Sequence, residues 1–160
     1  MDGELRGVKG WLLVFVLIMA VISPGWGAIR LYAALYTGPG AYLSEEPLFI
    51  SLRNVGWAVV AYTFVIGWIV AWRLLAIHNW NSVRIAIAGI WLASVGSVLM
   101  EYAAVTWVLG LPAEALAGQM GPMEFVRPFI FGLIWTSYLL KSERVQNTYR
   151  GVEEDIEVFE

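Results

Sequence analysis

Four long apolar runs set the limits on what this chain can fold into. We expect them at residues 11–35, 55–77, 83–109 and 125–140. About 20 helical residues cross the roughly 30 Å hydrocarbon core of a bilayer, and the fourth run reaches that length only with the residues near Lys141. An unpaired backbone amide is costly in lipid, so each run should be helical. The runs also lack the alternation of barrel strands. The sequence therefore predicts an all-α, integral membrane four-helix bundle.

Too few charged residues are present to give a soluble domain its polar surface. Charged side chains make up 14% of the chain, against roughly a quarter in typical soluble proteins. Cysteine is absent and His78 is the one histidine, which excludes disulfides, thiolate metal sites and a bis-histidine haem within one chain. The sequence has no glycine-rich phosphate loop, nucleophile elbow or HExxH motif. We therefore expect no enzyme activity, no cofactor, no metal and no nucleic-acid partner.

The apolar runs also define the domain organisation. The longest connection between them, at about residues 36–54, contains the turn-forming sequence Gly38-Pro39-Gly40. No stretch outside the runs is long enough for a soluble domain. We expect three parts: a short N-terminus at 1–10, a transmembrane domain at 11–140 and a tail at 141–160 that is first basic and then acidic.

The basic residues predict the orientation in the membrane, because Lys and Arg flank the cytoplasmic ends of membrane helices. With four spans, one side of the membrane carries seven of the ten basic residues: Arg6, Lys9, Arg73, Arg84, Lys141, Arg144 and Arg150. The other side carries the remaining three: Arg30, Arg53 and Arg127. We therefore expect a multi-pass protein of the inner (plasma) membrane with both termini in the cytoplasm.

Glu101 is the most informative single residue, because it lies inside the third apolar run. A carboxylate within a membrane is costly and should face the bundle interior, where it can find a partner. We expect an outer-leaflet cluster of Glu101 with Arg127, its best candidate partner, and with Arg53 and Arg30. Three roles are open: an ion pair that fixes helix register, a pocket for an anionic group, or a proton-carrying glutamate.

Two further features concern the backbone of the first and third runs. Pro24 removes a backbone donor and should break or kink the first helix. Such a kink is either structural or opens the backbone onto a ligand cavity, as in transporters with broken helices. Gly89, Ala93 and Ser97 form a face of small residues at a spacing of four on the third run, which favours close packing within the chain or, alternatively, a homodimer contact.

Basic residues continue beyond the fourth run. Lys141, Arg144 and Arg150 should lie on an extension of the fourth helix out of the membrane. They either anchor the topology or form a face that binds anionic lipid or a cytoplasmic or membrane partner.

Both ends of the membrane region carry motifs of a known family. In the last run Arg127 is followed by Ile134-Trp135-x-x-Tyr138, then by Ser142-x-Arg144-Val145 and Thr148-Tyr149, and the first run opens with Gly10-Trp11-Leu12-Leu13. This pattern resembles the YdgK-like family of small bacterial inner-membrane proteins of unknown function. The resemblance implies a four-helix inner-membrane fold and no established activity.

Two classes of function fit these observations best. The first is an accessory or interaction subunit of a larger membrane system, since the chain is small and has no soluble domain. The alternative is a protein that binds or transports a lipid or small anion through Glu101 and the arginines. A weaker third hypothesis is an enzyme that uses Glu101 and tyrosines on a lipid. The expected partners are the bilayer itself, with or without anionic lipid, and a membrane-protein partner or further copies of this chain.

Overall fold

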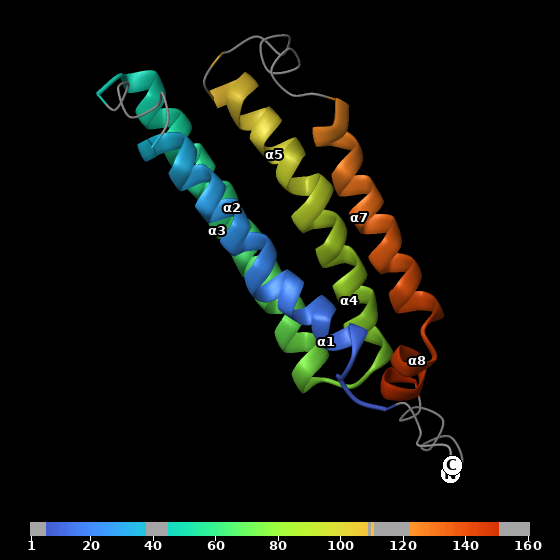
Figure 1. Ribbon diagram of the computed structural model, residues 1–160. Coiled ribbons are helices and arrows are strands. Elements are labelled where there is room, and N and C mark those ends of the chain that lie inside the picture. The colour runs from blue at the N-terminus through green and yellow to red at the C-terminus, as the bar shows by residue number, and fades with distance from the viewer. Residues whose placement is uncertain (1–5, 38–44, 109, 111–121, 151–160) are drawn as a thin grey trace.

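The computed structural model describes residues 6–37, 45–108, 110 and 122–150, and within these it is helical without strands. The Gly38-Pro39-Gly40 turn and the acidic end of the tail lie outside the described residues. The described helices run up and down along one axis, as Figure 1 shows. The all-α prediction is therefore confirmed for the described part of the chain.

The first helix is continuous from Trp11 to Thr37 and is followed by a second of 30 residues. Its segments, in order, are α1 (Trp11–Leu17), η1 (Ile18–Ile22), α2 (Ser23–Tyr32) and η2 (Ala33–Thr37). The second helix is α3 (Pro47–Ala76). The third helix comprises α4 (Trp80–Trp91), η4 (Leu92–Gly96), α5 (Ser97–Ala103) and η5 (Ala104–Val108). Two more helices follow, α7 (Pro122–Lys141) and α8 (Glu143–Tyr149).

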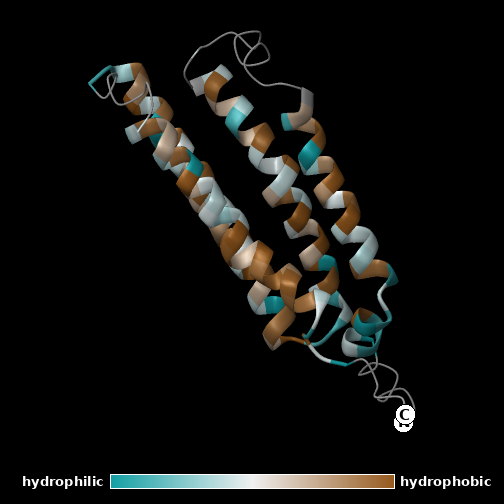
Figure 2. Cartoon of the chain, viewed as in Figure 1, coloured by the Kyte–Doolittle hydropathy of each residue, from teal (hydrophilic) through white to brown (hydrophobic). Residues whose placement is uncertain are grey.

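Three of these helices are long and apolar enough to cross a membrane: Trp11–Thr37, Pro47–Ala76 and Trp80–Trp107. The predicted fourth span corresponds to α7, which is not among the three although it has 20 residues. The reason is its polar content, since Glu124, Arg127 and Thr136 lie within it. Figure 2 shows the apolar residues spread along the helices and the hydrophilic ones gathered around α8.

The second helix begins eight residues before the predicted start at Val55. Its first residue is Pro47, and Glu46 before it has an extended backbone. Proline is favoured in the first turn of a helix, because its missing N–H is not needed there. The residues between Pro47 and Val55, which include Leu48, Ile50 and Leu52, therefore form the first helical turns of α3.

The first helix passes through Pro24 without a break, where the sequence predicted one. The turn before it, η1, is π-helical, and the Ser23 N–H bonds back five residues to the Ile18 carbonyl. Ile22 and Ser23 both keep right-handed helical backbone angles. Proline in a regular α-helix clashes with the carbonyl four residues earlier. The wider turn accommodates the ring and keeps the chain helical.

Glycines allow the helices to pack closely. A Cβ atom at Gly67 of α3 would collide with the backbone carbonyl oxygen of Met19 in η1, and one at Gly89 of α4 would collide with Val70 of α3. The missing side chain lets the backbones approach closely at Gly67 and makes room for the Val70 side chain at Gly89. The small-residue face around Gly89 therefore packs within the chain.

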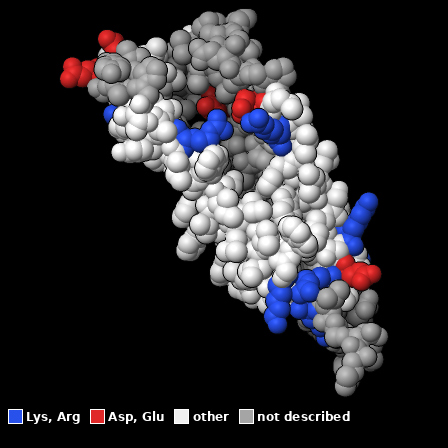
Figure 3. Space-filling view, viewed as in Figure 1, with Lys and Arg blue, Asp and Glu red and all other residues white. Residues whose placement is uncertain are grey.

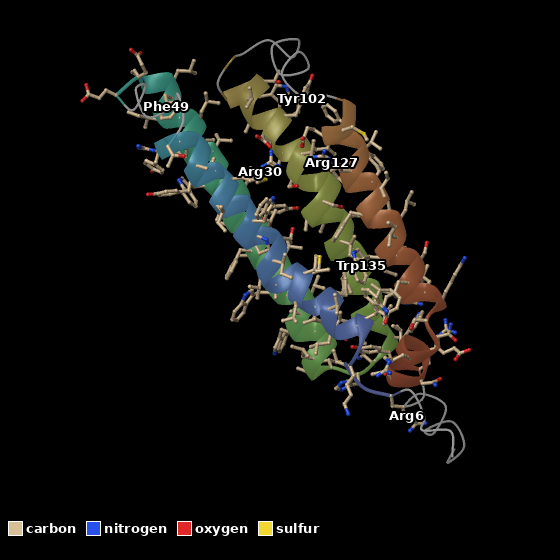
Figure 4. All side chains as sticks on the ribbon, viewed as in Figure 1. Arg6, Arg30, Phe49, Tyr102, Arg127 and Trp135 are labelled. Atoms are coloured by element: carbon tan, nitrogen blue, oxygen red, sulfur yellow. The ribbon has the colours of Figure 1, made fainter. Side chains whose placement is uncertain are left out.

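The apolar core lies at one end of the molecule, where α1, α3, α4, α7 and α8 meet. Phe15 of α1 and Trp135 of α7 have ring centroids 4.9 Å apart, which joins the first helix to α7. We call this the closed end; its buried residues include Leu12, Phe15, Val70, Leu74, Val83, Ile90, Leu139, Val145 and Tyr149. Arg6 lies at the same end (Figure 4), so both ends of the described chain meet there.

The sequence predicted that the fourth helix would continue through the basic tail, and the structure corrects this. Ser142 has an extended backbone and separates α7 from α8. Its position before Glu143 is typical of a helix start, since an acidic side chain favours the first turn. The Gln146 side chain donates to the Leu140 carbonyl at 3.1 Å, which satisfies one of the carbonyls left free at the end of α7.

The α8 helix closes the bundle through its last two residues. The Tyr149 hydroxyl donates to the Leu74 carbonyl near the end of α3 at 2.6 Å, and the Gly7 N–H donates to the Thr148 hydroxyl at 2.9 Å. The His78 ring stacks on that of Tyr149 with a centroid separation of 5.8 Å. One short helix thus holds the N-terminal segment and the α3–α4 turn together.

Replacing Gly67 with alanine should lower the free energy of unfolding by about 1–3 kcal/mol, because the added methyl group meets backbone that cannot move aside cheaply. Gly25→Ala is the matched control, since a Cβ at this helical glycine has no neighbour within 4 Å. Thermal unfolding in detergent, followed by tryptophan fluorescence, measures both. Equal melting temperatures for the two variants would contradict the close approach of η1 and α3.

Tyr149→Phe should cost about 0.5–1.5 kcal/mol, the usual contribution of one hydrogen bond. Tyr32→Phe, at an exposed ring, is the control. Hydrogen exchange of α8 should quicken in the first variant and stay unchanged in the second. Unchanged exchange of α8 in Tyr149→Phe would rule out this bond as its anchor.

A pH effect follows from the same residue, because burial raises the pKa of the Tyr149 hydroxyl. An unfolded tyrosine loses its proton near pH 10. The contribution of the protonated Tyr149 hydroxyl to the free energy of unfolding is therefore fully present below about pH 10. It is lost as the pH rises further, because the tyrosine then loses its proton in the unfolded state while it stays protonated in the folded state. Tyr149→Phe should show a smaller loss of stability between pH 9 and 11 than the parent chain, measured by the same thermal unfolding.

Candidate polar cleft

The half of the molecule away from α8 contains a polar cleft of about 300 Å³ between the first helix, the third helix and α7. Figure 3 shows it as a hollow in the side of the molecule with acidic and basic atoms around it. We call this site the cleft; it is lined by Met19, Ser23, Arg30, Ala93, Ser94, Ser97, Val98, Glu124, Arg127, Pro128 and Phe131. It narrows toward Phe15 and Trp135, where the first helix and α7 meet.

Two arginines reach the cleft from opposite sides. Arg30 comes from the last turn of α2 and Arg127 from the second turn of α7. Figure 4 shows both side chains in the space between the first helix and α7. The predicted meeting of Arg30 and Arg127 at one site is therefore found. Among the described residues they are the only basic ones that line the cleft.

Arg127 pairs with Glu124, which was not among its predicted partners. Its Nη1 atom lies 3.4 Å from Oε1 of Glu124, three residues earlier on the same helix. The expected partner was Glu101, but side chains three apart on one helix are neighbours whatever the tertiary fold. The pair is long and the two side chains are 67% and 44% exposed. Exposed pairs of this kind contribute little to stability.

Glu101 lies beside the cleft rather than in its wall. Its side chain is half-buried in α5. Within the described residues it makes no direct ion pair, and Arg127, its expected partner, pairs with Glu124 instead.

Arg53 of α3 does not join the cluster, since it is absent from the cleft wall. Because α3 begins at Pro47, Arg53 lies in its second turn. The tyrosines near the predicted cluster have other contacts: Tyr62 donates to the Leu92 carbonyl at 3.2 Å, and the Tyr32 ring packs on Tyr36. Of the four predicted members, Arg30 and Arg127 line the cleft, whereas Glu101 and Arg53 do not.

Two serines of the third helix line the back of the cleft: Ser97, predicted only as part of the small-residue face, and Ser94, for which no role was predicted. The Ser94 hydroxyl donates to the Ile90 carbonyl at 2.6 Å and that of Ser97 to the Ser94 carbonyl at 2.8 Å. Both serine hydroxyls therefore donate within the third helix, and Arg30 and Arg127 are the main hydrogen-bond donors left for a ligand. The i, i+3 spacing of Ser94 with Ser97, and of Glu124 with Arg127, was the signal that could have revealed them.

Pro24 and Ser23 face different surfaces of the first helix. Ser23 lines the cleft, whereas Pro24 lines an apolar groove of about 540 Å³ between the first helix and α3. This groove also contacts Trp57, Phe64 and Trp68. The hypothesis that backbone freed by Pro24 lines a polar ligand site is therefore not supported at the cleft.

The three basic residues expected on a free face beyond the fourth helix lie at the closed end. The Arg150 guanidinium stacks on the Trp80 ring, 4.0 Å from its centroid. That of Arg144 lies beside Gly10, and Lys141 is exposed at the end of α7. Two of the three therefore contact the bundle itself.

No three histidine, aspartate or glutamate side chains lie close enough together to hold a metal ion in the part of the chain that the structure describes.

The family model for a protein of unknown function (DUF2569) matches residues 5–150. The chain therefore belongs to this family, and the prediction of a family without a known function is confirmed. The match covers all the described helices but does not carry the narrower YdgK-like name. No curated protein and no solved structure matches the chain.

The Glu124–Arg127 pair should contribute less than about 1 kcal/mol to stability, because it is long and exposed to solvent. Glu124→Gln, Arg127→Gln and the double variant form a double-mutant cycle, and thermal unfolding of each gives the coupling energy. A coupling above about 2 kcal/mol would contradict a weak, solvent-exposed pair.

Proposed function

We propose that this member of the DUF2569 family is a small membrane protein that binds an anionic group in its cleft. The observation that carries the proposal is the convergence of Arg30 and Arg127, from helices far apart in the sequence, on one hollow in a largely apolar molecule. Charged side chains within a membrane protein are costly and mark functional sites more often than those at a water-exposed surface.

The chemistry of the arginines supports this proposal. A guanidinium presents several donors in a fixed plane that match a carboxylate or phosphate, and it keeps its charge at any physiological pH. Such charge-assisted hydrogen bonds are stronger than neutral ones, especially where little water is present. Because Arg127 has only a long contact with Glu124, an incoming anion can compete with that carboxylate.

The proposal includes a topology. We infer that α7 is the fourth span, with Glu124, Arg127 and Pro128 turned to the cleft. We place the closed end, with its seven basic residues, in the cytoplasm and the cleft in the outer leaflet of the inner membrane, following the excess of Lys and Arg on cytoplasmic sides. An alkaline phosphatase fused to the C-terminus should then be inactive; an active fusion would contradict this orientation.

The narrower YdgK-like assignment is also part of the proposal. It rests on Trp135 and Tyr138, whose rings form an edge contact at 5.7 Å, and on Thr148 and Tyr149, which dock α8. These motif residues build the closed end. They therefore support a shared fold, while the cleft is the site that we expect to determine the ligand.

An accessory subunit is the second candidate, and one observation favours it. Large apolar side chains on α7 are exposed: Ile130, Leu133 and Ile134. Lipid covers such a face by default, but the helix of a partner could do so as well. Like the first proposal, this one involves no catalytic chemistry by the chain.

Arg30→Gln and Arg127→Gln should each weaken anion binding by about 1.5–3 kcal/mol, or roughly ten- to a hundredfold, since each removes a charged hydrogen-bond donor. Native mass spectrometry of the protein, extracted gently from its own membrane, measures the retained small molecule. Arg84→Gln changes an exposed arginine outside the cleft wall and is the control.

Each outcome of that measurement bears on one proposal. Retention by the parent chain and by Arg84→Gln, with loss in both cleft variants, supports anion binding. Equal retention in all four proteins would overturn it. A stoichiometric second polypeptide without a retained anion would favour the accessory subunit instead.

A further inference from the structure

The cleft opens sideways between two helices, and this limits the kind of ligand that it can take. The first helix and α7 touch through Phe15 and Trp135 at the closed end. Beyond that point Ser23 and Arg30 of the first helix face Phe131 and Arg127 of α7 across the cleft, and the third helix forms the back wall. In Figure 3, which looks across the helix axes, the hollow is visible from the side of the molecule.

The side opening lies at the depth of the bilayer. Met19 at the inner end of the cleft and Arg30 near its outer end belong to the same spanning helix. They are 11 residues apart in the sequence, which corresponds to about 16 Å along a helix axis. A gap of this length beside a spanning helix faces lipid over much of one leaflet.

The cleft is polar at one end and apolar at the other. Arg30, Arg127 and Glu124 lie toward the end away from α8, whereas Met19, Ala93 and Phe131 lie nearer the closed end. Two of the three serines between them, Ser94 and Ser97, already donate to backbone carbonyls, so Ser23 is the one described serine of the lining whose hydroxyl is left to donate. The deep part therefore has few free donors for a small hydrophilic solute, and its lining suits a hydrocarbon chain.

The volume of the cleft also favours a ligand that remains partly in the bilayer. About 300 Å³ is at the lower end of the range for ligand pockets. That space accommodates a headgroup and the first part of a chain, and the side opening lets the rest of the ligand remain in the bilayer.

We propose that the ligand is an amphiphile with a phosphate or carboxylate headgroup, which enters sideways from the bilayer between the first helix and α7. Its headgroup is held by Arg30 and Arg127, and its chain lies along Met19 and Phe131. This inference rests on the proposed anion binding and deepens it, because a free anion would need the arginines but neither the side opening nor the apolar floor.

The first test compares three probes on the full chain in detergent: phosphatidylglycerol, its water-soluble headgroup glycerol phosphate, and inorganic phosphate. Native mass spectrometry should show retention of phosphatidylglycerol, at least roughly tenfold weaker in Arg30→Gln, and no retention of the soluble anions. Equal binding of the soluble anions, also lost in Arg30→Gln, would overturn the amphiphile and leave anion binding intact. Lipid retention that is the same in Arg30→Gln and the parent would overturn both.

The second test closes the side opening. The chain has no native cysteine, so Ser23→Cys with Phe131→Cys provides one reactive pair on opposite walls of the cleft. Bridging the pair with a short bis-maleimide should lower lipid uptake from phosphatidylglycerol vesicles by roughly tenfold or more, relative both to the unbridged double variant and to each single-cysteine variant treated with the same reagent. Normal uptake by the bridged protein would overturn entry through this opening.

The two tests also separate a folding defect from a binding defect. All cysteine variants are compared before and after the reagent, so each serves as its own folded reference. Phosphatidylcholine, which carries a zwitterionic headgroup on the same kind of chains, serves as the lipid control. If the protein retains phosphatidylcholine as strongly as phosphatidylglycerol, it binds the hydrocarbon chains without distinguishing the anionic headgroup. That result would contradict the inference.

Discussion

The contact between Phe15 and Trp135 is the point at which the first and last long helices of the chain are held together. Aromatic pairs of this kind stabilise beyond the area they bury, and around this pair lies the only described region where the core side chains are fully inaccessible. The docked α8 reinforces it, because the Tyr149 hydroxyl satisfies a carbonyl near the end of α3. Fixing the helices at one end leaves them free to diverge at the other.

That divergence explains why polar residues can exist inside the membrane region. Arg30, Arg127 and Glu124 line a hollow rather than a packed interface, so they avoid the full desolvation that burial in an apolar core would impose. Had the helices packed tightly along their whole length, these charges would need direct partners or would not be tolerated. A firm closed end and an open polar end are thus two consequences of the same asymmetric packing.

The two ends also divide the roles of the sequence motifs. The residues through which the chain resembles YdgK-like proteins, among them Trp135, Tyr138, Thr148 and Tyr149, build the closed end. The cleft is built by scattered residues of three helices, and among the described lining residues Arg127 alone belongs to the motif pattern. Sequence patterns therefore reveal the scaffold of this molecule more readily than its site. The proposed ligand follows from where the charges meet and from the direction in which the hollow opens.

The sequence by itself determined that the chain is helical and apolar enough to cross a membrane, because run length and hydropathy are local properties of the chain. It also indicated that Glu101, Arg127, Arg53 and Arg30 would gather at the end away from the basic tail. Only the tertiary structure decided that Arg30 and Arg127 meet at one cleft and that Arg53 stays outside its wall. The same holds for the π-turn at Pro24 and the return of α8 onto the bundle. These depend on how the helices are rotated and spaced against one another, and on contacts between residues far apart in sequence, which hydropathy does not encode.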